Sequence, residues 1–293
     1  MHGGTGDRIA AGVSSPGMLG TTEEDVGTRQ AEDRPRRRKL SAERPGRGEE
    51  FAYDEARHLA AYFHAREIAR DRDVLDAGCG EGFGTVLLAE TARSVLGVDY
   101  SAAAVAVARA SHRRANLDFR QVEVHALATL GRRFGLITNF QVIEHLPDPA
   151  RFLTIARDTL AEDGLLLLTT PNRLTSVSEN PVHVREYSAD ELRQLLAPMF
   201  ARVELHSMMG SEQVRAFDAE RGRQVQRILR LDPLGLRHLL PQRVMYFAFA
   251  HLGALVRRRA VHASVEVRIA PADFRVVAEC RPDALDHVAL CWR

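Results

Sequence analysis

The sequence predicts an α/β fold in which a mostly parallel sheet is covered by helices on both faces. From residue 74 onward, short runs of aliphatic and β-branched residues alternate with stretches whose apolar residues recur at helical spacing. The runs VLDA (74–77) and LLLLTT (165–170) are apolar without alternation, as expected of strands covered on both faces. Parallel strands joined by right-handed crossovers would place the helices on the two faces.

The elements are expected in the following order along the chain. An amphipathic helix covers about 53–70, where Ala56, Leu59, Ala60, Phe63 and Ile68 repeat at helical spacing. The next strands are expected at 74–77, 94–98, 117–122, 136–140 and 165–170. The helices between and after them are expected at 84–90, 102–113, 150–160 and 189–196.

The pattern changes after residue 202. A strand is expected at 203–206, then a helical insertion at about 210–260, and then strands at 274–278 and 287–292. Within the insertion, the apolar stretch 244–256 is shorter than the roughly 18 residues that a membrane span needs. It is bounded by arginines, so it predicts either a buried cap helix or an interfacial helix that contacts lipid or a lipid-linked acceptor.

Composition narrows the class of protein. Residues 1–48 contain few apolar residues and a basic run at 34–39, which predicts a disordered tail before a domain at 49–293. The 40 basic residues nearly cancel the 39 acidic ones, which argues against a nucleic-acid partner. Three cysteines without metal-type spacing favour a reducing, cytoplasmic location, and no secretory signal is visible.

A glycine-rich turn follows the first strand in VLDAGCGEGFG. At the carboxyl edge of a parallel sheet, glycines let the backbone approach a nucleotide closely, and Gly78, Gly80 and Gly82 stand there. A dinucleotide fold would want glycine where Phe83 stands, and a P-loop would need Gly-Lys-Ser/Thr. The spacing therefore favours a different nucleoside.

Two acidic residues flank this turn. Asp99 ends the second strand about twenty residues later, where a carboxylate can accept hydrogen bonds from both ribose hydroxyls. Asp76 lies inside the first strand and is either a structural cap or part of the ligand site. Two acids around such a turn suit a cationic nucleoside that carries an amino acid.

This pattern resembles motif I of class I S-adenosylmethionine-dependent methyltransferases, and the resemblance covers about residues 51–206. It implies S-adenosylmethionine as cofactor and a Rossmann-like, seven-stranded sheet whose final strand is antiparallel. It also implies that Asp99 binds the ribose and Glu123 lies by the adenine, although Val122-Glu123-Val124 departs from the usual Gly-Asp-Ala and Phe134-Gly135 from Phe-Asp. The expected cofactor-binding residues are Asp76, Gly78, Gly80, Gly82, Asp99, Tyr100, Glu123 and Phe140.

The segment NFQVIEHLPDP (139–149) is similar to the methyltransferase type 11 and ubiquinone O-methyltransferase group, which commonly has Glu-x-x-Glu-His-x-x-Asp-Pro. Some relatives bind a divalent metal through the two glutamates and the histidine. Here Gln141 replaces the first glutamate, and Glu144 with His145 would make a poor site for a hard cation, so no metal is expected. His145 is expected to act as an acid/base or to orient the acceptor, or else to pack at a helix start.

A second polar loop follows the strand at 165–170. It holds His183, Arg185, Glu186 and Tyr187, and it is similar to segments of bacterial methyltransferases that act on sugars and other small acceptors. The alternative is a loop held by its own salt bridges. The Asn-Pro-Pro-Tyr motif of enzymes that methylate nucleic-acid bases is absent from the sequence.

Two histidines at the acceptor edge favour methylation of a hydroxyl, because an alcohol must lose its proton during attack. The expected catalytic residues are therefore His145 and His183, and the expected acceptor is a small molecule or glycoconjugate, with a sugar favoured. A quinone or phenol O-methyltransferase, an N-methyltransferase and a non-catalytic S-adenosylmethionine-binding protein remain as alternatives.

Overall fold

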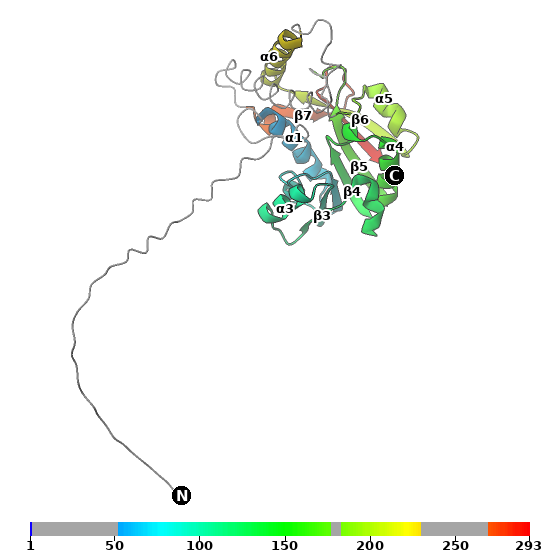
Figure 1. The fold of residues 1–293 in the computed structure, drawn as a ribbon. Coiled ribbons are helices and arrows are strands. Elements are labelled where there is room, and N and C mark those ends of the chain that lie inside the picture. The colour runs from blue at the N-terminus through cyan, green and yellow to red at the C-terminus, as the bar shows by residue number, and fades with distance from the viewer. Residues whose placement is uncertain (2–51, 177–182, 230–268) are drawn as a thin grey trace, which may run out of the picture. The chain divides into compact units, whose positions relative to one another are not determined.

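The computed structural model describes residues 52–176, 183–229 and 269–293, together with Met1 (Figure 1). The chain divides into the units Met1–Lys39 and Leu40–Arg293, and every described helix and strand belongs to the second unit. The expected tail at 1–48 and the apolar stretch 244–256 lie outside the described residues.

Eight strands form one sheet in the order β3-β2-β1-β4-β5-β8-β6-β7. The strands are β1 (Asp73–Ala77), β2 (Ser94–Asp99), β3 (Leu117–Gln121), β4 (Phe134–Phe140), β5 (Leu160–Pro171), β6 (Arg202–Gly210), β7 (Phe274–Val277) and β8 (Asp286–Trp292). The first five strands pair in parallel, whereas β8 runs antiparallel to both β5 and β6. The predicted fold class is confirmed, and β7 adds one antiparallel strand to the seven that the resemblance implied.

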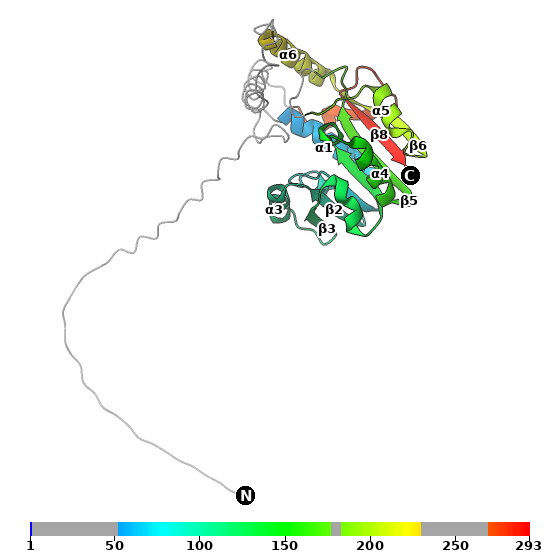
Figure 2. The ribbon, with the colours of Figure 1, turned by 45° about the vertical axis from the view of Figure 1, so that its right-hand side comes forward.

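Helices cover both faces of this sheet. The helices are α1 (Ala52–Ile68), α2 (Thr85–Leu88), α3 (Ala102–Ser111), α4 (Pro149–Thr159), α5 (Ala189–Leu196) and α6 (Glu212–Leu229), with short 3-10 turns η2 (Val124–Leu130), η3 (Ile143–His145) and η5 (Pro271–Asp273). Side chains of α1, α2 and α6 form one apolar core with the sheet, and those of η2, α4 and α5 form another. Figures 1 and 2 show α1 on one side of the central strands and α4 with α5 on the other. Double coverage explains the non-alternating apolar runs.

Side-chain caps fix where several helices begin. The Ser101 side chain accepts a hydrogen bond from the backbone N–H of Ala104 at 3.3 Å and so caps α3. Asp148 caps α4 in the same way, directly before Pro149 at the first helical position. Ser188 and Glu191 form a capping box at the start of α5.

Two element boundaries differ most from the expectation, while the others shift by one or two residues. Leu160, which fits the helical spacing of 150–160, is the first residue of β5 because it pairs with Phe134 and is fully buried. The strand at 203–206 continues to Gly210, so the expected insertion begins with α6 at Glu212, and its part from 230 to 260 lies outside the described residues. Within the described ranges, none of the helices combines the length and the apolarity that crossing a membrane requires.

Candidate active site

The turn after β1 has the shape of a ligand cradle. Gly78, Gly80 and Gly82 all have positive φ angles, of 92°, 56° and 80°. A Cβ atom on Gly78 would lie 2.4 Å from Cγ2 of Val142, and one on Gly82 would lie 2.6 Å from Cζ of Phe119, so the turn is tightly packed at both ends. A Cβ on Gly80 would meet no described atom within 4 Å. The centre of the turn is therefore open to a ligand.

Asp99 is held against this turn at the carboxyl end of β2. Its Oδ2 accepts the backbone N–H of Gly80 at 3.0 Å, and its Oδ1 accepts that of Ser101 at 2.8 Å. The residue is only 6% exposed. A carboxylate offers about four acceptor positions, so this one can still accept hydroxyl hydrogens. Turn and carboxylate together fit a nucleoside with a ribose.

Asp76 lies beneath the turn and is 1% exposed. Its carboxylate accepts hydrogen bonds from the hydroxyls of Tyr62 at 3.1 Å, Thr85 at 2.6 Å and Thr138 at 2.8 Å. Burial raises the pKa of Asp76 to about 6. Because these hydroxyls belong to α1, α2 and β4, Asp76 connects three elements to β1 beneath the cradle. A direct role in cofactor binding stays a prediction.

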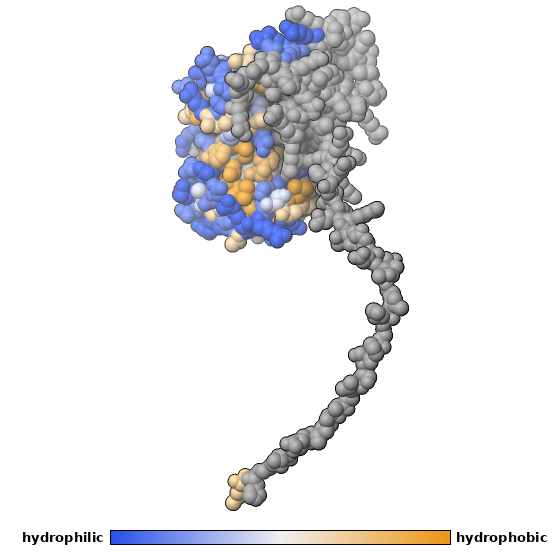
Figure 3. All heavy atoms as spheres, turned by 90° about the vertical axis from the view of Figure 1, so that its left-hand side faces the viewer, coloured by the Kyte–Doolittle hydropathy of each residue, from blue (hydrophilic) through white to orange (hydrophobic). Residues whose placement is uncertain are grey.

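The other three expected cofactor residues lie around the same edge. Tyr100 follows Asp99 and is 57% exposed, and its carbonyl accepts a hydrogen bond from the Gln121 side chain. Glu123 is exposed at the start of η2. Phe140 is buried, with its ring edge-on to that of Tyr62 at 4.8 Å. Figure 3 shows apolar atoms gathered between polar zones on the side where α1 and α3 lie. Contacts of these three residues with a cofactor stay predictions.

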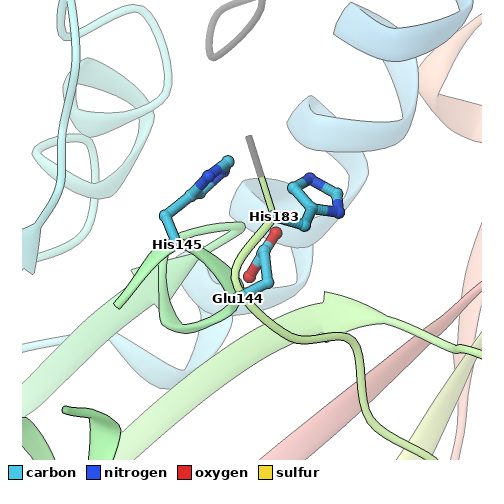
Figure 4. A group of neighbouring side chains, drawn as sticks. All are labelled: Glu144, His145 and His183. Carbon is cyan, nitrogen blue, oxygen red and sulfur yellow. The ribbon is translucent and has the colours of Figure 1, made fainter. Parts of the chain in front are cut away.

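The structure brings His145 and His183 together, although the sequence indicated them separately. His145 ends η3, directly after β4, and His183 belongs to the loop after β5. The backbone N–H groups of Val184 and Arg185 donate to the carbonyl oxygen of Glu144 at 2.7 and 3.1 Å, which holds this loop on η3. The two imidazole rings meet edge to face, with centroids 4.8 Å apart (Figure 4).

Glu144 precedes His145 on η3, and its carboxyl group points toward the loop that carries His183 (Figure 4). It is 1% exposed, and its Oε2 accepts the hydroxyl hydrogen of Thr170 at 3.1 Å. Its Oε1 is buried and has no hydrogen-bond partner among the residues that the structure describes. Burial raises the pKa of Glu144 to about 8. A second carboxylate, that of Glu186, lies 2.7 Å from Nδ1 of His183. The sequence identified Glu144 only by analogy with metal-binding relatives, and the Glu-His pair directly after a strand was the available signal.

The donor atoms of Glu144, His145 and His183 lie within 4.8 Å of one another, close enough to share a metal ion. One carboxylate with two imidazoles suits zinc-type ions more than magnesium. Gln141 does not complete a carboxylate-rich set, because its amide N–H donates to Asp286 at 3.0 Å and its backbone has a φ of 55°. That the protein works without a metal stays a prediction.

A buried ion pair beside this cluster was not expected from the sequence. Arg57 of α1 donates through Nε to Oδ2 of Asp286 at 2.7 Å and through Nη2 to Oδ1 of Asp286 and to the carbonyl of Leu285. Next to it, burial lowers the pKa of His58 to about 4, so His58 is neutral at pH 7. Arg57 and Asp286 are 229 positions apart, and no local pattern signals their contact.

The sheet with its antiparallel β8, the open glycine turn and the carboxylate of Asp99 define a class I S-adenosylmethionine-dependent methyltransferase fold. The family model described as a methyltransferase domain matches residues 49–217, more than half of the chain, and the protein belongs to this family.

Curated relatives and a solved structure agree with this assignment. A protein of Mycobacterium tuberculosis named as a probable S-adenosylmethionine-dependent methyltransferase is 39% identical over 172 residues, which are 57% of this chain and 62% of that protein. A ubiquinone biosynthesis O-methyltransferase of Cereibacter sphaeroides is 35% identical over 102 residues, 34% of this chain and 41% of that protein. The chain thus spans less than two thirds of these relatives. An S-adenosylmethionine-dependent methyltransferase of Thermotoga maritima shares the fold, with a TM-score of 0.52, 13% identity and coverage of 83% of this chain and 91% of that one.

Proposed function

We propose that the protein binds S-adenosylmethionine at the Gly78–Gly82 turn and transfers its methyl group to a hydroxyl of a small molecule or glycoconjugate, with a sugar-type acceptor favoured. The observation that carries the choice of a hydroxyl is the contact between the rings of His145 and His183, 4.8 Å apart at the carboxyl edge. Asp99 would hold the ribose, and Glu123 and Phe140 would lie along the rest of the nucleoside.

The bound sulfonium supplies an activated methyl group. The chain then has to align the acceptor with it, which can contribute on the order of 7–11 kcal/mol. It also has to take a proton from an alcohol, and a histidine can add roughly 10²–10⁴-fold to the rate in this way. His145 and His183 are the groups we assign to this step. Neither lies on the glycine turn, so loss of either should spare cofactor binding.

A quinone-type phenol is the second candidate acceptor. The similarity to a ubiquinone biosynthesis O-methyltransferase supports it. Against it, Gln141 replaces the glutamate common in that group, and its amide is engaged with Asp286. An amine acceptor would need less help from a base. With such an acceptor, His145 and His183 would have no catalytic role as bases.

The test uses the full chain and S-adenosylmethionine with a labelled methyl group. Panels of sugars, polyhydroxylated phenols and amines are offered separately, and label transfer is measured for the wild type, His145→Ala and His183→Ala. At least one variant should lose roughly 10²-fold or more in turnover on a hydroxyl acceptor. Affinity for S-adenosylhomocysteine should stay near that of the wild type in both. His112→Ala, at the end of α3 and outside this cluster, is the matched control.

Three outcomes would contradict the proposal in different ways. Full turnover in both histidine variants would make them packing residues and favour an amine acceptor. Transfer to phenols alone would favour the quinone-type reading. Binding of S-adenosylhomocysteine without transfer to any panel would favour a non-catalytic cofactor-binding protein.

A further inference from the structure

The first turns of α1 lie at the carboxyl edge of the sheet, where the ligands are expected to bind. α1 ends at Ile68 shortly before β1 begins at Asp73, so the last turn of the helix lies at the amino edge and the first turns lie toward the carboxyl edge. The contact of Arg57 agrees with this direction, because its partner Asp286 pairs with Pro171 at the carboxyl end of β5. Side chains on the first turns of α1 are therefore close to the expected acceptor site.

His58 follows Arg57 on this part of α1 and is half-buried. The centroid of its ring lies 6.0 Å from that of Phe83, at the glycine-rich turn, and 5.9 Å from that of Tyr62. On the other side, the negative charge of Asp286 acts on the pKa of both His58 and Glu144, so it lies near both groups. The His58 ring thus lies between the expected cofactor site and the cluster around Glu144.

The groups around His58 leave its ring uncharged at neutral pH. The charged side chains that face it are Asp54 and Arg57 of α1 and Asp286 of β8. Arg57 and Asp286 are paired, and the Gln141 amide donates to the same carboxylate at 3.0 Å. Burial lowers the pKa of His58 to about 4, so the imidazole is neutral at pH 7. A neutral imidazole has one N–H donor and one acceptor nitrogen, and an alcohol hydroxyl can pair with either.

We propose that His58 is a further acceptor-binding residue, whose imidazole hydrogen-bonds to a hydroxyl of the acceptor other than the one that is methylated. This inference rests on the proposed function. Because the charges of Arg57 and Asp286 compensate each other beside this contact, the part of the acceptor that binds there is uncharged. The rings of Phe83 and Tyr62 border the contact and offer apolar area to a sugar or phenol ring. The acceptor is therefore a neutral molecule that carries at least two hydroxyls.

Chemical modification of the full chain tests where the His58 ring faces. Diethyl pyrocarbonate acylates neutral imidazoles, and mass spectrometry identifies the modified positions with and without saturating S-adenosylhomocysteine. A histidine with the ordinary pKa of about 6.5 should react about tenfold more slowly at about pH 5.5 than at about pH 7.5. His58, with a pKa of about 4, should react at nearly the same rate at both. S-adenosylhomocysteine should change the rate at His58 by no more than about twofold.

Two results of this modification would overturn the proposal. Protection of His58 by S-adenosylhomocysteine would make it a cofactor contact. Absence of reaction at His58 in both forms of the protein would make it a packing residue of α1.

Steady-state kinetics then test the contact itself, with whichever compound of the three panels receives the labelled methyl group. His58→Phe keeps an aromatic ring but removes both ring nitrogens, so the KM for this acceptor should rise about tenfold. The KM for S-adenosylmethionine should stay within about twofold of the wild-type value. His58→Gln, which keeps a donor and an acceptor, should recover part of the loss, and His58→Ala gives the same comparison if the phenylalanine variant does not fold.

His64→Phe is the matched control, because it makes the same substitution on the same helix. The charge that acts on His64 is that of His206 on β6, not that of Asp286. This variant should keep the acceptor KM of the wild type.

The inference and the proposed function would fail in different ways. Methyl transfer by the wild type with an unchanged acceptor KM in His58→Phe would overturn the inference alone. So would a preference for a sugar phosphate over the parent sugar. No transfer from the wild type to any panel would refute the proposed function, and the inference with it.

Discussion

Replacing Asp99 with alanine tests the cofactor site most directly. The substitution removes a carboxylate that receives two backbone N–H groups, at 3.0 and 2.8 Å, and that we expect to accept the ribose hydroxyls. A hydrogen bond to a charged group contributes roughly 1.5–3 kcal/mol, which corresponds to about one to two decades in affinity. Loss of the contact to Gly80 also loosens the turn, so the larger value is the better expectation.

Isothermal calorimetry with S-adenosylmethionine and S-adenosylhomocysteine measures this effect. The wild type should bind both and should bind neither NAD nor ATP. Asp118→Ala removes a surface acid of β3 whose partners among the described residues are Arg120 and the backbone N–H of Phe119, and it should bind like the wild type. Tight NAD binding by the wild type, or unchanged affinity in Asp99→Ala, would refute the assignment of this site.

Three further predictions concern stability and metal dependence. Deleting residues 1–45 should leave the melting temperature and cofactor affinity nearly unchanged, because that sequence has no apolar pattern that could build a core; loss of folding would show the opposite. EDTA should leave methyl transfer within a few-fold of its starting rate, and complete loss that magnesium or zinc restores would make Glu144 and His145 metal ligands. Because burial raises the pKa of Asp76 from 3.8 to about 6, the folded state keeps a proton that the unfolded chain loses in this window, so the free energy of unfolding should fall by about 2 kcal/mol as the pH rises from 4 to 6. Urea unfolding should show that Asp76→Asn lacks this slope, and an equal slope in both proteins would show that other groups cause it.

Much of the expected cofactor site could be predicted from the sequence because the residues that indicate it lie close together along the chain. A buried strand, a glycine turn and an acid at the end of the next strand lie within 26 positions, from Val74 to Asp99. The orientation of Asp76 could not be predicted in the same way. Whether a strand residue faces a ligand or the core depends on partners from other elements, here the hydroxyls of Tyr62, Thr85 and Thr138.

Boundaries and long-range contacts were harder for physical reasons. Leu160 suits a helix and a strand equally well, and its pairing with Phe134 decides between them. His145 and His183 were each predicted, but their contact depends on the backbone of Glu144, which accepts two N–H groups from the second loop. No pattern in the sequence around Arg57 or around Asp286 predicts the ion pair between them.

The position of β8 has a consequence for how the sheet is assembled. β8 follows every other strand in the sequence, yet it lies between β5 and β6 and pairs with both. Strands β6 and β7 therefore cannot join the parallel part of the sheet until residues 286–292 have been made and inserted. Since β5 and β8 are far apart in the chain, this step carries a large loop-closure cost and should be among the slow steps of folding. Until β8 pairs with β5, the edge of β5 that ends beside Thr170 and Glu144 stays unpaired. The acceptor side of the site therefore forms after the cofactor side.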